Sequence, residues 1–114
     1  MSEDSLPGSR FILDVHLGKL AKFLRLLGFD TRYSNSFSDR EISQEAHREK
    51  RIILTRDKGL LKRKIVTHGY YIKSRNSREQ LFEVVKRFDL LRSLKPFEYI
   101  SFQLFCHILY PLTQ

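Results

Sequence analysis

Three aspartates, Asp14, Asp39 and Asp57, are the residues of this sequence whose types and spacing could support catalysis. Asp14 directly follows the apolar run 11–13, and Asp57 lies just beyond the apolar run 52–54. Asp39 opens a segment with helical spacing. Since sites in open α/β sheets form beyond the carboxyl ends of the strands, we expect the three carboxylates to meet at one edge of a sheet.

Crowded carboxylates repel one another and raise each other's pKa unless a positive charge lies between them. A divalent cation supplies that charge, and Mg²⁺ prefers carboxylate and water oxygens. Such an ion can activate water and hold the oxygens of a phosphodiester during in-line displacement. We therefore predict Asp14, Asp39 and Asp57 to be both catalytic residues and ligands of Mg²⁺ or Mn²⁺, since both metals suit carboxylate sites.

Each aspartate also has a purely structural interpretation. Asp14 could cap the following helix, a role worth typically ~1 kcal/mol. Asp39 could be a first-turn acid that the helix dipole favours. Asp57 could cap the next helix or pair with Arg56. These alternatives stay open at the level of sequence.

The charge balance points to a polyanionic partner. The 114 residues contain 21 Lys and Arg against 13 Asp and Glu, which gives a net charge of +8. A strongly basic chain favours nucleic acid, and here we expect RNA. Lys19, Arg56 and Lys58 lie close to the aspartates in sequence, and we predict that they bind RNA phosphates.

Composition also limits the compartment. The single cysteine, Cys106, excludes an internal disulfide framework and cannot form a zinc site alone, so a reducing, cytoplasmic location is the default. Residues 1–9 are polar, lack the features of a signal peptide and are expected to form a disordered tail. Residues 96–114 are rich in large apolar side chains but are too short to span a membrane. We expect this extension to cover a sheet edge, as a strand or helix, or to dock a protein partner or a second copy.

The hydrophobic pattern alternates between strands and helices. Strands are expected near 10–14, 29–33, 51–54 and 69–73, with helical patterns following each of them, which predicts a parallel α/β sheet within one domain, residues 10–95. Ser38 and Ser77 are expected to begin two capping boxes. Glu45 and Glu49 lie one turn apart on the second helix and are expected to form part of a solvated face.

The segments "RFILDVHLGKLAKFLRLLGFDT", "SDREI" and "RIILTRDKGLLKRK" together resemble the Mut-seven C-terminal RNase family, a PIN-like group, over residues 10 to about 91. The resemblance implies a PIN-like three-layer fold, in which helices flank a central, mostly parallel sheet. It also implies a Mg²⁺- or Mn²⁺-dependent ribonuclease whose acids would be Asp14, Asp39 and Asp57.

The chain departs from this family pattern in three places. The stretch "IKSRNSREQ" offers only Asn76 where PIN-like nucleases often place a fourth acid, which would weaken a second metal site. His16 stands where relatives usually have an apolar residue. The cysteine-rich, zinc-ribbon-like tail of many members is represented by Cys106 alone. Two alternatives therefore stay open, an RNA-binding module with weak or no nuclease activity and a protein-interaction fragment that docks through its apolar tail.

Overall fold

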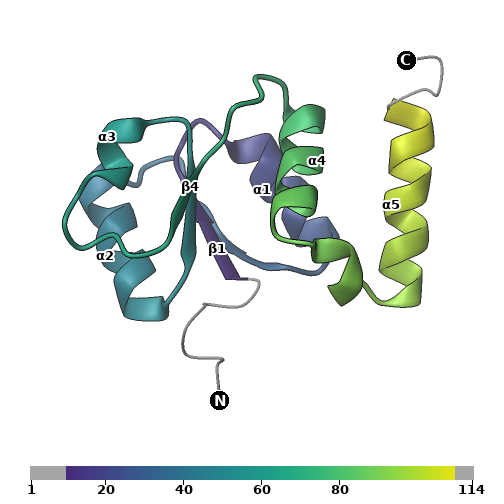
Figure 1. Ribbon diagram of the computed structural model, residues 1–114, viewed down its shortest axis with the longest axis horizontal. Helices are drawn as coiled ribbons and strands as arrows, with labels where there is room; N and C mark the ends of the chain where they lie inside the picture. Colours follow the sequence, from purple (N-terminus) through teal and green to yellow (C-terminus); the bar gives the residue numbers. More distant parts are fainter. Residues whose placement is uncertain (1–9, 110–114) are drawn as a thin grey trace.

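The computed structural model describes the backbone of residues 10–109 and the side chains of residues 10–104. Within this range the strands form one parallel sheet in the order β2-β1-β3-β4 (Figure 1). The strands are β1 (Arg10–Leu13), β2 (Asp30–Arg32), β3 (Ile52–Thr55) and β4 (Gly69–Tyr71). The predicted parallel α/β sheet is confirmed, and residues 1–9, the expected disordered tail, lie outside the described range.

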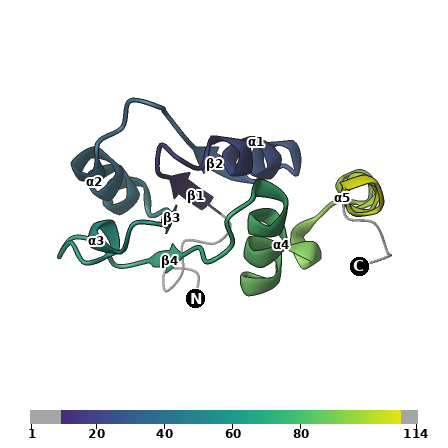
Figure 2. The same ribbon diagram turned by 90° about the horizontal axis from the view of Figure 1, so that it is seen from above.

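Helices cover both faces of the sheet. Seen from above, α1 and α4 lie on one face and α2 and α3 on the other (Figure 2). The helices are α1 (Gly18–Leu26), α2 (Asp39–Glu49), α3 (Lys58–Leu61), α4 (Ser77–Arg87), the 3-10 helix η2 (Leu90–Ser93) and α5 (Pro96–Leu109). The sheet and its two helical layers give the three-layer arrangement that the sequence predicts.

The two-residue period of the strands divides the core between these layers. Phe11 and Leu13 of β1 pack in the cluster that includes α1 and α4, whereas Ile12 packs in the cluster that includes α2 and α3. In β1 and β3, Leu13 is paired with Leu54, so the next residues, Asp14 and Thr55, face each other across neighbouring strands. By the same alternation both fall on the α2 and α3 side of the sheet.

The helix ends agree with the sequence in one case and differ in another. Ser38 begins α2 with the complete predicted capping box, in which its side chain accepts from the Glu41 backbone and the Glu41 carboxylate accepts from the Ser38 backbone. The capping box predicted at Ser77 is wrong, because Asn76 is the N-cap of α4 and accepts a hydrogen bond from the backbone N–H of Glu79 at 2.9 Å. An asparagine caps a helix as well as a serine does, so the helix begins one residue earlier.

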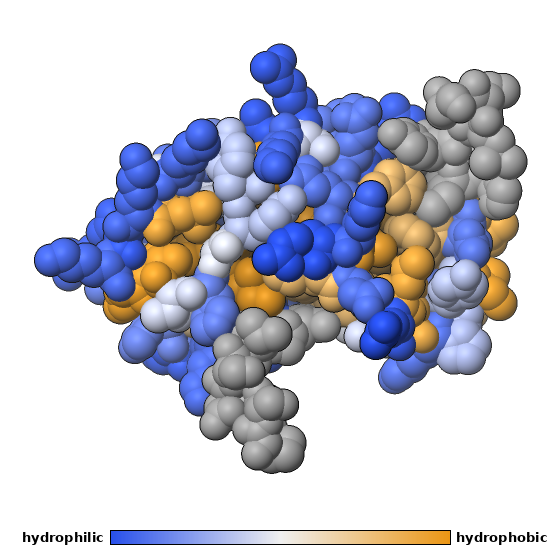
Figure 3. Space-filling view, viewed as in Figure 1, coloured by the Kyte–Doolittle hydropathy of each residue, from blue (hydrophilic) through white to orange (hydrophobic). Residues whose placement is uncertain are grey.

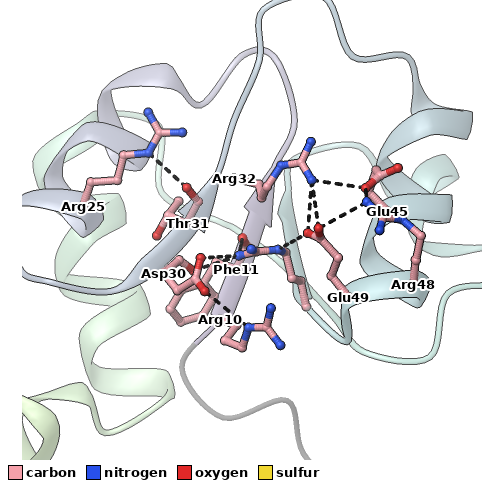
Figure 4. A network of polar contacts seen from close by, with 10 residues as sticks. Arg10, Phe11, Arg25, Asp30, Thr31, Arg32, Glu45, Arg48 and Glu49 are labelled. Carbon is pink, nitrogen blue, oxygen red and sulfur yellow. Dashed lines mark hydrogen bonds and ion pairs between the residues drawn. The ribbon is translucent and has the colours of Figure 1, made fainter.

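The glutamates of α2 form a network rather than a solvated face, so that expectation is wrong. Arg32 of β2 donates to Glu45 Oε1 and Glu49 Oε2, both at 3.1 Å (Figure 4). Arg51, whose side chain is only 6% exposed, donates from its guanidinium to Glu49 Oε1 at 2.7 Å and to Asp30 Oδ1 at 2.8 Å. We call this the basal ion-pair network, since Asp30 and Arg51 lie at the amino ends of β2 and β3.

Residues 96–109 of the apolar extension form α5, which lies beside α4 and not along an edge of the sheet (Figures 1 and 2). The expectation that it covers a sheet edge is therefore wrong. Phe102 is buried and packs edge-on against Phe82, with ring centroids 5.7 Å apart. Phe97, Ile100 and Leu104 stay exposed, and Figure 3 shows apolar side chains gathered around α5. No helix within the described residues is both long and apolar enough to cross a membrane.

Candidate functional site

Asp14 is the buried centre of the rim formed by the carboxyl ends of the strands. Its carboxylate accepts hydrogen bonds from Thr55 Oγ1 at 2.5 Å and from the backbone N–H of His16 at 2.8 Å. Its own backbone N–H donates to Leu54 at 3.3 Å. The helix-cap interpretation of Asp14 is wrong, because α1 begins after Leu17 without a side-chain cap. Asp14 is instead fixed in orientation by its neighbours.

Thr55 connects this carboxylate to the next strand end. It is fully buried, donates to Asp14 and accepts a hydrogen bond from the backbone N–H of Asp57 at 2.9 Å. The role of Thr55 is not apparent from the sequence, because threonine is an ordinary strand residue. The available signal was its position, a hydroxyl at the end of a buried apolar run just before an aspartate.

Asp57 follows β3 and is exposed at the rim. Its Oδ1 accepts from the backbone N–H of Gly59 at 2.8 Å, which makes it the N-cap of α3. The capping interpretation is thus confirmed, whereas the described ion pairs include none between Asp57 and Arg56. The cap uses one carboxylate oxygen, which leaves Oδ2 for another interaction.

Asp39 is the first residue of α2, and its carboxyl group lies close to that of Asp57. Partial burial of its carboxyl group raises its pKa, and the negative charges of Asp57 and Asp14 raise it further. A side-chain hydrogen bond with Asp57 acts in the same direction, while the guanidinium of Arg63 opposes the shift. Such an interaction requires the Asp39 and Asp57 carboxyl groups to be adjacent. Asp39 and Asp57 are therefore neighbours at the rim, and Asp14 is near enough to act on Asp39 through its charge, whereas a shared metal site of all three aspartates stays a prediction.

These residues suit a hard divalent cation in the chemistry of their donors. The described residues contain no ready-made group of three His, Cys, Asp or Glu ligands. The rim does supply carboxylate oxygens from three segments, and the repulsion that raises the pKa of Asp39 is the kind that a bound cation relieves. We therefore consider the three aspartates compatible with the predicted Mg²⁺ or Mn²⁺, whose binding stays a prediction.

The predicted phosphate-binding cations have different surroundings. Arg56 Nη1 donates to the backbone carbonyls of Ile72, Lys73 and Ser74 at 2.9–3.0 Å, so this guanidinium positions the loop before α4. Lys58 Nζ lies 5.1 Å from the centre of the Tyr71 ring. Lys19 is exposed and lines a polar cavity beside the rim. Their roles toward phosphate stay predictions.

Asn76, the neutral residue of the stretch before α4, is the N-cap of that helix. Its side-chain oxygen accepts from Glu79 N, so the residue serves the helix as a cap. The described acids of the rim remain Asp14, Asp39 and Asp57.

We predict that Thr55→Val destabilises the fold and disorders Asp14. Valine matches threonine in shape but cannot donate to Asp14 or accept from Asp57, which leaves buried polar groups without partners. The expected cost is about 1–3 kcal/mol of unfolding free energy. Urea denaturation measures it, and Thr31→Val is the matched control, since the Thr31 hydroxyl bonds only the nearby Phe29 carbonyl. Equal stability of Thr55→Val and the wild type would contradict the assigned role.

Glu83 of α4 accepts hydrogen bonds from the loop before α4, which Arg56 also contacts. We expect the ionisation of Glu83 to affect the pH dependence of the unfolding free energy. Burial raises its pKa, but hydrogen bonds from Lys73 N, Tyr70 Oη and Ser74 N outweigh burial and lower the pKa to about 2. Because this value lies below the ordinary 4.5, the ionised carboxylate stabilises the fold above pH 4.5. The contribution disappears as the pH falls from 4.5 toward 2.

Glu83→Gln should therefore lower the unfolding free energy at pH 7 by about 2 kcal/mol. The difference from the wild type should shrink at pH 3, and urea titrations at the two pH values measure it. Glu79→Gln, at an exposed position of the same helix, serves as the control. A difference that is independent of pH would show that Glu83 is not stabilised as an anion.

A parallel sheet between two helical layers, with carboxylates beyond the carboxyl ends of its strands, is the architecture of a PIN-like domain. The family model described as the Mut7-C RNAse domain matches residues 9–101, and the chain belongs to this family. Membership indicates a nuclease-type function and confirms the resemblance identified from the sequence. Comparisons with curated proteins and with solved structures gave no significant match.

Proposed function

We propose that this protein is a divalent-metal-dependent ribonuclease that hydrolyses RNA phosphodiester bonds at Asp14, Asp39 and Asp57. The observation that carries the proposal is the position of these acids, two beyond the carboxyl ends of β1 and β3 and one at the start of α2, where burial and the charges of Asp57 and Asp14 raise the pKa of Asp39. A second support is the net charge of +8 in a chain of an RNase family. An isolated acidic cluster would be poorly suited to bind RNA, but this one is embedded in a basic protein.

The three aspartates would hold Mg²⁺ or Mn²⁺, which when bound supplies an activated water and neutralises charge on the phosphate. The contribution of the chain itself is orientation. Thr55 and the His16 backbone fix the Asp14 carboxylate, while the Gly59 N–H fixes one oxygen of Asp57. Preorganised ligands need little rearrangement when substrate arrives, which favours catalysis.

An RNA-binding module with weak or no turnover is the second candidate. It is favoured by Asn76, which occupies the place of a fourth acid and is engaged as a helix cap. Loss of that charge would weaken a second metal position while leaving the basic surface intact. This candidate predicts salt-dependent RNA binding without cleavage.

Cleavage of a labelled RNA of mixed structure distinguishes the two candidates. Mg²⁺ or Mn²⁺ is titrated into the purified protein, a chelator is then added, and Asp57→Asn is measured in parallel. The ribonuclease proposal predicts cleavage that requires metal, stops with chelator and is absent in the variant. Binding without cleavage under both metals would reject it in favour of the binding module.

The proposal also covers the role of the apolar extension and the cellular compartment of the protein. Exposed Phe97, Ile100 and Leu104 on α5 support docking of a second copy or a protein partner through this helix. The single cysteine, Cys106, supports a reducing, cytoplasmic compartment, where RNA is accessible.

A further inference from the structure

A polar cavity of about 520 Å³ lies beside the aspartate rim, on the α1 and α4 side of the sheet. Residues of the β1–α1 segment and of the β4–α4 segment line it together. They are His16, Leu17, Gly18, Lys19, Arg75, Asn76, Ser77 and Gln80. The cavity begins next to Asp14, because His16, one of its lining residues, donates its backbone N–H to that carboxylate.

The charge of this cavity is entirely positive. Lys19 and Arg75 are exposed, and neither is paired with a carboxylate in the part of the chain that the structure describes. No Asp or Glu is among the lining residues. Two unpaired cations that face one polar cavity favour an anionic ligand with little apolar surface, such as a phosphate.

Both walls of the cavity are held in place by side-chain hydrogen bonds. On the β1 side, Tyr33 Oη donates to the Val15 carbonyl at 2.7 Å. On the β4 side, Gln80 Nε2 donates to the carbonyls of Ser74 and Arg75 at 3.1 and 3.3 Å. Arg56 binds the same loop through the carbonyls of Ile72 and Lys73 and shares the Ser74 carbonyl with Gln80. The cavity therefore exists before a ligand arrives, which lowers the entropic cost of binding.

We propose that this cavity binds the RNA backbone next to the scissile phosphodiester, with Lys19 and Arg75 contacting one or two phosphates. The proposal rests on the ribonuclease function and adds to it the path of the substrate, from α1 and α4 across Asp14 to Asp57 and Asp39. The volume of the cavity suits about one nucleotide, since small-molecule sites typically measure ~300–1,000 Å³. Contacts to phosphates alone would give little sequence preference.

The test measures binding of a fluorescein-labelled oligouridylate by anisotropy, in chelator, over a range of salt concentrations. The double variant Lys19→Ala/Arg75→Ala should reduce the slope of log K against log salt by about 1.4, given ~0.7 per contact to a single strand. The same relation predicts an affinity loss of about 25-fold at 0.1 M salt. Lys86→Ala, which removes one charge from the last turn of α4, should leave the slope unchanged.

The charge-conserving double variant Lys19→Arg/Arg75→Lys should retain most of the affinity, because simple phosphate contacts need charge more than shape. An unchanged slope and affinity in the alanine double variant would overturn the cavity proposal. So would an equal loss in Lys86→Ala, since binding would then depend on overall charge. Chelator separates this result from the ribonuclease proposal, because RNA binding can succeed or fail whether or not metal-dependent cleavage occurs.

Discussion

Asp14→Asn is expected to reduce RNA cleavage by about a hundredfold or more, with little change in RNA affinity. Asp14 is the buried acid of the rim, and its carboxylate is held by Thr55 and by the His16 backbone. Asparagine keeps the size of the side chain but removes the negative charge with which a divalent cation would be bound. Loss of a single group that activates or positions the nucleophile typically costs ~10²–10⁴ in rate. Single-turnover cleavage at saturating protein measures the effect directly.

Asp30→Asn is the matched control for this experiment. Asp30 begins β2, at the opposite end of the sheet, where it pairs with Arg51 and Arg10. Its replacement should lower stability and leave the cleavage rate of the folded protein unchanged. Full activity of Asp14→Asn, or an equal loss in Asp30→Asn, would show that the rim is not the catalytic centre.

Arg51→Ala is expected to have the largest effect on stability, about 3 kcal/mol. Arg51 is buried and donates to Glu49, to Asp30 and to the Phe11 backbone carbonyl. Removing one partner of a buried pair usually costs ~3–5 kcal/mol, since the remaining charge loses its compensation. We expect the lower end here, because Glu49 keeps Arg32 and the Asp30 side chain is 56% exposed.

Urea unfolding of Arg51→Ala gives this free energy, with Arg92→Ala as the control. Arg92 pairs with Asp89 at the surface, where its side chain is 84% exposed. Exposed pairs contribute at most ~1 kcal/mol, so this variant should resemble the wild type. Equal unfolding free energies for the two variants would contradict a stabilising role for the basal ion-pair network.

Much of the fold follows from local patterns that the sequence displays. Short apolar runs followed by helical spacing predict the parallel sheet, and "SDREI" predicts the capping box of α2. The candidate acids follow from the same reasoning, since residues that leave parallel strands meet at one edge. These features depend on residues that are close together in the chain, and they can therefore be predicted without the tertiary structure.

The features that sequence reasoning missed depend on long-range contacts. Thr55 meets Asp14 only because β1 and β3 are neighbours in the sheet, although the two residues are far apart in the chain. Glu49 of α2 binds Arg32 of β2, a contact between two elements that a helical pattern alone cannot reveal. The position of α5 against α4 likewise depends on the packing of Phe102 against Phe82. Such pairs are fixed by topology and not by local spacing.

Mn²⁺ binding, followed by electron paramagnetic resonance, tests the central claim that Asp14, Asp39 and Asp57 together hold a divalent cation. Mn²⁺ is titrated into the wild type, into Asp39→Asn and into the control Asp30→Asn. We predict saturable Mn²⁺ binding by the wild type and by Asp30→Asn, and its loss in Asp39→Asn. Equal Mn²⁺ binding by all three proteins would contradict a metal site at the rim.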